Sequence, residues 1–320
     1  NSALTFTSTA NVTTMANMFQ NCTAFNQPVP FNTSAVTNMS SMFNSCTNFN
    51  QAVAFNTASV ITMGSMFNGC SAFNQAINFT TGAVTTMNAM FGFCSSFNTA
   101  PIFTSTANIT NMSQMFQNSS AFNKPLTFDC SSATNMSEMF IGNASLNSAI
   151  TLTNTTNVQN MQGMFQNCTS FNQAINFTTG VALTNMSSMF QNCPTLNIAP
   201  SFTNTTGVTN MSSMFQSCTN FNQAINFTTT AVTNMSNMFA FCSAFNSSIT
   251  FSSTANVTSM SSMFRICSAF NQPLNFNTTA VTTMQGMFES CSAFNSVLTF
   301  TSTSAVTDMS FMFYSCSAFN

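Results

Sequence analysis

A single motif, Met-x-x-Met-Phe, constrains this chain more than any other feature, because it recurs every 24 or 25 residues from end to end. All 26 methionines fall at its two methionine positions. A strict period of this length predicts a solenoid, in which each repeat is one coil that buries its apolar face only by stacking on its neighbours. We therefore predict thirteen coils in one uncapped solenoid domain over residues 1–320. The first methionines of the motif are Met15, Met39, Met63, Met87, Met112, Met136, Met161, Met186, Met211, Met235, Met260, Met284 and Met309.

The methionine segment of each repeat has apolar residues at helical spacing. In the second repeat Val36, Met39, Met42, Phe43 and Cys46 are three, three, one and three residues apart, which predicts one face of a short helix. The residue before the first methionine is Ser, Thr, Asn or Asp in every repeat, and these side chains cap helices by accepting a bond from an amide of the first turn. We predict one short helical turn per coil.

A second segment of each repeat alternates apolar and polar residues. Ile77-Asn-Phe79 and Leu298-Thr-Phe300 are two examples, and a period of two predicts a short strand with one buried face. Stacked coils place these strands side by side in parallel. Disordered chains are poor in aromatic residues, whereas here 39 phenylalanines recur in fixed columns and predict a packed core.

The composition excludes several classes of function. Only six residues are charged, so there is no basic surface for nucleic acid. No apolar run approaches the roughly 18 residues of a membrane helix, so membrane insertion is not expected. The chain has no histidine, no paired carboxylates and no glycine-rich phosphate loop, and we predict neither an enzyme nor a cofactor.

The run Val-Thr-x-Met-x-x-Met-Phe-x-x-Cys-x-x-Phe-Asn-Gln, at residues 36–51 and again at 208–223, carries a family resemblance. It resembles the bacterial surface-protein repeat of mycoplasmal and listerial lipoproteins, which belongs with the BspA-type leucine-rich repeats. The resemblance covers the whole chain, which differs from the usual pattern in having no tryptophan. It implies a leucine-rich-repeat-like solenoid, on a cell surface or secreted, that acts in adhesion or assembly.

Eleven of the twelve cysteines share one position of the repeat. Stacking places neighbouring members about 5 Å apart, close enough for a disulfide, so buried thiols, disulfides between coils and a metal site are all open. Ser119 and Asn143 stand at the same position and favour thiols, while the absence of histidine and of Cys-x-x-Cys disfavours a metal. The cysteine column comprises Cys22, Cys46, Cys70, Cys94, Cys168, Cys193, Cys218, Cys242, Cys267, Cys291 and Cys316.

An asparagine follows the second Phe or Leu of every repeat. An amide side chain offers donors and an acceptor to the turns of its own coil and of the next, so we predict a structural asparagine ladder. Its members are Asn26, Asn50, Asn74, Asn98, Asn123, Asn147, Asn172, Asn197, Asn222, Asn246, Asn271, Asn295 and Asn320.

Asn-x-Ser/Thr sequons are abundant. Capping should engage those before the first methionine, such as Asn38 and Asn210, whereas Asn78, Asn176 and Asn226 lie in mid-strand and should point outward. These three are the candidate glycosylation sites. The alternative is that a chain rich in Asn and Thr generates sequons by chance.

Two irregular features interrupt the repeats. Residues 117–155 depart from the pattern and hold Lys124, Asp129 and Glu138, which we interpret as a site or as a tolerated bend. Arg265 and Glu289 occupy one column of adjacent repeats, so they should lie about 5 Å apart as an exposed pair. We assign that pair no function.

The function predicted first is an extracellular structural protein, a glycosylated subunit or segment of a filament or surface layer. Asn1 and Asn320 occupy the same column, so the chain spans whole periods without caps, which predicts head-to-tail stacking on itself. The alternative is a surface adhesin that binds glycans, or an ice-binding solenoid. Outward pairs such as Thr5-x-Thr7, Thr151-x-Thr153 and Thr299-x-Thr301 favour ice binding, but other coils break the array.

Overall fold

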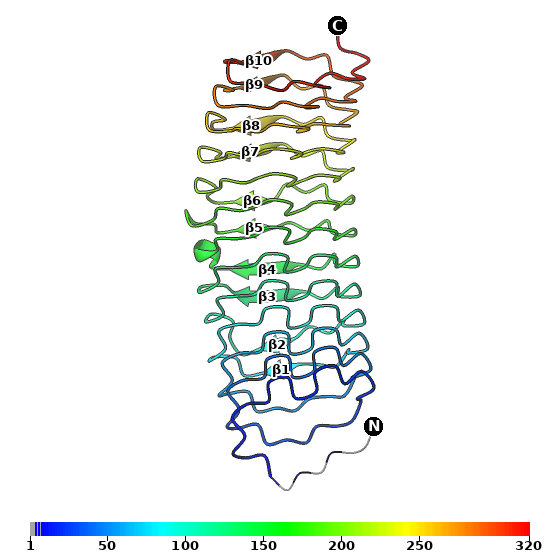
Figure 1. Ribbon diagram of the computed structural model, residues 1–320, viewed down its shortest axis with the longest axis vertical. Coiled ribbons are helices and arrows are strands. Elements are labelled where there is room, and N and C mark those ends of the chain that lie inside the picture. The colour runs from blue at the N-terminus through cyan, green and yellow to red at the C-terminus, as the bar shows by residue number, and fades with distance from the viewer. Residues whose placement is uncertain (1–3, 5, 7) are drawn as a thin grey trace. The chain divides into compact units, whose positions relative to one another are not determined.

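The computed structural model describes Leu4, Phe6 and residues 8–320 (Figure 1). The chain divides into two compact units, Asn1–Asn157 and Val158–Asn320, and in each of them the repeats are stacked coils (Figure 1). Asn1, Thr5 and Thr7 lie outside the described residues. That all the coils form a single domain stays a prediction.

The strands form where the sequence alternates apolar and polar residues. The first unit contains β1 (Asn78–Phe79), β2 (Ile102–Phe103), β3 (Leu126–Asp129), β4 (Ile150–Thr153) and a 3-10 turn, η1 (Thr155–Asn157). The second contains β5 (Asn176–Phe177), β6 (Ser201–Phe202), β7 (Ile225–Phe227), β8 (Ile249–Phe251), β9 (Leu274–Phe276) and β10 (Leu298–Phe300). In β7 the residues are buried, exposed and buried in turn, as expected for a strand with one buried face.

The strands pair in parallel with equivalent positions of the repeat in register. β1 pairs with β2, β3 with β4, β5 with β6, β7 with β8 and β9 with β10. Phe79 lies opposite Phe103, and Phe227 opposite Phe251. The predicted class, a repeat solenoid with parallel strands, is confirmed. The prediction of a strand in each of thirteen coils is wrong, because the described residues form ten strands in five separate two-stranded sheets.

The predicted helical turn is also wrong. The amide of Met18 donates to the Met15 carbonyl at 3.3 Å, three residues back, while that of Asn17 donates to Ser40 of the next coil at 3.0 Å and that of Phe19 to Met42 at 2.8 Å. Amides therefore alternate between a tight turn in their own coil and a bond to the neighbouring coil.

Left-handed backbone explains why no helix forms. The residue two places after the first methionine has a positive φ in every repeat, for example 60° at Asn17 and 55° at Ser41, and so has the residue four places further on, with 63° at Asn21. A right-handed helix cannot contain such residues. The apolar residues three positions apart, which we interpreted as one face of a helix, lie in successive tight turns of the coil.

The core lies inside each coil and consists of the methionine, phenylalanine and valine columns. Met39, Met42 and Phe43 are fully buried. Phenylalanines stack along the coils in two columns: the ring centroids of Phe43 and Phe67 are 5.6 Å apart, and those of Phe49 and Phe73 are 6.0 Å apart. The two columns also stack on each other, with 4.3 Å between Phe43 and Phe49. Offset aromatic stacking adds to the free energy of burial at every step.

The residues before the first methionines form a second set of contacts between coils. Thr14 and Asn38 make a parallel bridge, and Asn38 and Thr62 make the next. The Oδ1 atom of Asn38 accepts a bond from the amide of Ser40 at 2.9 Å, and Asn210 does the same for Ser212 at 3.0 Å. These side chains therefore cap a turn, where we had predicted that they cap a helix.

Candidate functional site

Nearly all thiols of the cysteine column are buried and bonded to backbone, while Cys22 in the first coil is exposed. No disulfide joins any of the twelve cysteines. The Sγ atom of Cys46 donates to the carbonyl of Phe19 in the preceding coil at 2.9 Å, and that of Cys242 donates to Phe215 at 2.9 Å. Burial raises the pKa of Cys46 to about 11 and that of Cys218 to about 12, so both are neutral at physiological pH. Neutral, buried thiols are poor nucleophiles and poor metal ligands.

Ser119 and Asn143 stand in this column in place of cysteine, and only Ser119 makes the hydrogen bond to backbone. The hydroxyl of Ser119 donates to the Phe91 carbonyl at 2.5 Å, as a thiol does elsewhere. Asn143 is fully buried, yet neither its Oδ1 nor its Nδ2 atom has a hydrogen-bond partner. Since native structures leave few buried polar atoms unpaired, Asn143 is a weak point of the first unit.

Cys130, the cysteine outside that column, belongs to a column of buried threonines that our sequence analysis missed. The hydroxyl of Thr57 donates to the Thr80 carbonyl of the next coil at 2.9 Å, and that of Thr254 donates to Asn277 at 2.8 Å. Its buried threonines are Thr33, Thr57, Thr81, Thr106, Thr155, Thr179, Thr205, Thr229, Thr254 and Thr278. A threonine two or three residues after the strand phenylalanine was the available signal.

That spacing of two or three residues alternates along the strand-bearing coils. Thr81 is the second residue after Phe79, whereas Thr106 is the third after Phe103. Each two-stranded sheet joins a coil of the first kind to the following coil of the second kind. The extra residue supplies an acceptor inside the pair, because Thr81 donates to the carbonyl of Ser105. Among the described strands, each sheet ends after the coil that carries the extra residue.

Grooves open beside some of these sheet ends. The first, about 460 Å³, lies between β2 and β3, and the third, about 540 Å³, between β8 and β9. The second, about 410 Å³, is lined by Leu4, Phe6, Ser8 and Thr9 on one side and by residues 30–32 on the other. The later coil of each groove has a proline, Pro28, Pro125 or Pro273, where the other coils have Ala, Ser or Val.

The asparagine column forms bonds from coil to coil. The Oδ1 atom of Asn26 accepts from the amide of Asn50 at 2.9 Å, and that of Asn50 accepts from Asn74 at 3.0 Å. In the second unit Asn271 accepts from the amide of Asn295 at 2.8 Å. Gln51 and Gln75 add their side-chain amides to the same oxygens.

The three candidate glycosylation sites lie on strands. Asn78 in β1, Asn176 in β5 and Asn226 in β7 are each exposed, and each neighbouring phenylalanine is buried. Of the outward threonine pairs, Thr151 and Thr153 are exposed on β4. Ile102, Asn176 and Ser201 stand at the outward positions of other strands and break the array.

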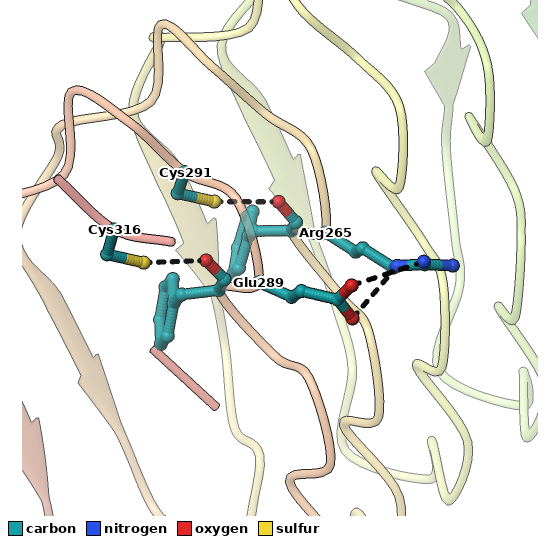
Figure 2. A network of polar contacts seen from close by, with 6 residues as sticks. Arg265, Glu289, Cys291 and Cys316 are labelled. Atoms are coloured by element: carbon teal, nitrogen blue, oxygen red, sulfur yellow. Dashed lines mark hydrogen bonds and ion pairs between the residues drawn. The ribbon is translucent and has the colours of Figure 1, made fainter. Parts of the chain in front are cut away.

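The predicted pair of charges is formed. Arg265 Nε lies 3.0 Å from Glu289 Oε2, and a second nitrogen of Arg265 donates to Oε1 at 3.2 Å (Figure 2). The guanidinium carbon lies 5.5 Å from the ring centroid of Phe241. Figure 2 shows this pair beside the thiol bonds of Cys291 and Cys316. With side chains 38% and 21% exposed, it is an ordinary surface ion pair.

Nothing in the described part of the chain brings three His, Cys, Asp or Glu residues together as a metal site. Among those same residues, no helix has the length and apolarity to span a bilayer. The stacked coils, parallel strands and backbone-bonded columns define a repeat solenoid protein.

Comparison with known protein families places the chain more closely. A family described as "Mycoplasma protein of unknown function, DUF285" matches residues 1–105, 102–202, 184–276 and 252–320. The chain belongs to this family. The match confirms the predicted resemblance to a repeat family of mycoplasmal proteins.

Two solved structures are similar at low identity. A leucine-rich cell surface protein from Faecalibacterium prausnitzii A2-165 is 16% identical with a TM-score of 0.48, over 80% of this chain and 74% of that one. The TLR13–ssRNA13 complex is 7% identical with a TM-score of 0.30, over 83% of this chain and 44% of that one. Both likenesses are too distant to indicate a function. Comparison with curated proteins finds no match.

Proposed function

We propose that this chain is an extracellular structural protein whose role is to build a surface layer or filament. The observation that carries the proposal is the continuous bonding between coils in each unit. Amides, thiols, threonine hydroxyls and asparagine side chains all bond to the adjacent coil. Such contacts present different groups on the two faces of a coil, so they are heterologous and can repeat without closing into a ring.

A surface of Ser, Thr and Asn with six charged residues supports an extracellular setting, as does the family resemblance. In that setting Asn78, Asn176 and Asn226 are the proposed glycan acceptors, because they are exposed in mid-strand. The buried, neutral thiols and the chain's lack of histidine support a role without catalysis. The asparagine column acts in this proposal as a structural ladder.

A binding surface is the second candidate function. The grooves beside β3 and β9 favour it, because they are open recesses on the strand face. Ice binding is the weaker form of this candidate, since Ile102, Asn176 and Ser201 interrupt the regular array that a lattice match requires.

Electron microscopy of the purified chain across a range of concentrations tests the structural role. We expect filaments or sheets whose length grows with concentration, with sedimentation velocity showing a matching rise in mass. Particles of one chain at every concentration would reject head-to-tail stacking. Mass spectrometry of the chain from a glycosylating host would locate sugars, and unmodified Asn78, Asn176 and Asn226 would reject the proposed acceptors.

A further inference from the structure

The groove between β2 and β3 differs from the other two in its chemistry. β2 pairs only with β1 and β3 only with β4 among the described strands, so the groove separates two sheets of the first unit. At its far end Thr106 bridges the gap, since its hydroxyl donates to the Asp129 carbonyl at 2.9 Å and accepts from the Asp129 amide at 2.8 Å. The recess is therefore fixed in width by hydrogen bonds.

The rim of this groove is apolar on both sides. Ile102 is 60% exposed, which is unusual for a side chain of this size, and the exposed Pro125 lines the groove from the next coil. Ile102 is exposed because it stands at an outward position of its strand. Pro101, next to it, takes the buried position that Leu126 fills in β3 and Ile150 in β4. Thr104 and Thr127 are exposed beside this rim and offer hydroxyls.

Asp129 is also a lining residue, and its carboxylate is held in one orientation. Its Oδ1 atom accepts from the Ser131 amide at 3.1 Å, from the Ser131 hydroxyl at 2.5 Å and from Asn154 Nδ2 at 3.0 Å. All three bonds fall on Oδ1, which orients the group. The corresponding positions of the other grooves hold Asn32 and Asn277, so they have an amide where this one has a carboxylate.

We propose that this groove binds a neutral sugar ring. A pyranose has an apolar face that matches Ile102 and Pro125, and hydroxyls that match Thr104, Thr127 and a carboxylate acceptor. An anionic ligand would meet Asp129 with no cation in the lining, and a wholly apolar ligand would leave the hydroxyls unpaired. A volume of about 460 Å³ is within the range of small-ligand sites. This site deepens the second candidate function and is independent of filament formation.

Saturation-transfer NMR on the intact chain tests the proposal, with the methyl glycosides of glucose, galactose and mannose and with N-acetylglucosamine as probes. We expect transfer to at least one sugar, with an affinity that falls about tenfold in Asp129→Asn and about threefold in Ile102→Thr. Both variants should fold, because other coils already hold the new residues. Asn204 and Asn277 stand at the position of Asp129 and accept the same bond from the amide two residues later. Thr127 and Thr151 stand at the position of Ile102.

Two matched variants serve as controls. Asp308→Asn changes another turn-capping aspartate, and Ile61→Thr changes another exposed isoleucine, and neither residue lines the groove. Both should bind sugar as the unaltered chain does. The proposal is overturned if none of the four sugars receives saturation, or if the controls weaken binding as much as the groove variants. It is also overturned if an apolar dye displaces the sugars and survives both groove substitutions. Loss of sugar binding alone would leave the structural role untouched.

Discussion

Replacing Asn143 with cysteine should stabilise the first unit, although Asn143 is fully buried in the core. Substituting a buried residue usually destabilises the protein. Asn143 is the exception because its Oδ1 and Nδ2 atoms have no hydrogen-bond partner. The neighbouring coils show what fits this position, since Cys94 donates its thiol to Phe67 in the preceding coil at 3.0 Å. In Asn143→Cys the equivalent acceptor is the carbonyl of Phe116.

The expected gain follows from the two orphaned atoms. Leaving a buried polar group unpaired costs about 1–3 kcal/mol, so removing two such atoms of one side chain should stabilise the unit by about 2 kcal/mol at the lower limit. Cysteine is close to asparagine in size, so little cavity or overpacking offsets this gain. For a unit of this length, 2 kcal/mol corresponds to a rise of about 4–8 °C in Tm.

Differential scanning calorimetry of the intact chain, with urea unfolding as a second measure, provides the assay. Asn143→Ser should give a smaller gain, because Ser119 already fills this position with a bonded hydroxyl. The reciprocal change, Cys94→Asn, should destabilise the same unit by a similar amount. If Asn143→Cys leaves the transition unchanged or lowers it, the buried amide has a partner such as water, and our interpretation of this position is wrong.

Three further predictions concern the backbone, the surface and the thiols. Ile266 has a φ of 59°, which costs a β-branched residue about 1–2 kcal/mol. Ile266→Gly should therefore raise the free energy of unfolding in urea by about 0.5–1 kcal/mol. The control Ile61→Gly, at an ordinary φ, should lower it. Glu289→Gln removes the exposed ion pair with Arg265 and should change stability by less than about 1 kcal/mol; a larger loss would mean that the pair is not screened. Burial raises the pKa of Cys218 to about 12, so its contribution to stability should be complete below about pH 8.5 and decline from there towards pH 12, and a flat unfolding free energy between pH 7 and 11 would contradict this.

The strands and the core could be predicted from sequence because their signals are local. Ile225-Asn-Phe227 alternates with a period of two, and a strand with one buried face follows from that alone. The buried methionines and phenylalanines were equally evident, since a column of apolar residues repeated in every coil has to face the interior.

The helical turn was mispredicted because two structures share one spacing. Residues three apart lie together both on a helix and in consecutive tight turns. The distinguishing signal was the pair of columns that hold Asn17 and Asn21, in which asparagines and glycines such as Gly69 and Gly163 tolerate a positive φ. Phe241 and Ile266, which also have positive φ, obscure it, because bonds from their amides to Arg265 and Glu289 of the adjacent coils impose the turns there.

The groove at β2 could not be predicted from any one repeat. It combines Pro125 in one coil with Pro101, Ile102 and the extra residue before Thr106 in the preceding coil. Each of these is a small departure from the consensus, and only their juxtaposition creates a recess. The unpaired amide of Asn143 could not be predicted either. Its cost in stability arises because the side chain is buried without a hydrogen-bond partner, and no residue pattern shows this.

The alternation of two-residue and three-residue spacings also bears on how such a chain can lengthen or shorten during evolution. Duplicating one coil would place two coils of the same kind side by side and alter the edge of a sheet. Duplicating the segment from Phe79 to Phe128, or from Phe177 to Phe227, would copy both kinds of coil together and preserve every existing strand pair. From Phe79 onward the unit of duplication is therefore a double coil, and gene variants that gain or lose repeats there in even numbers should be the ones that keep their sheets intact.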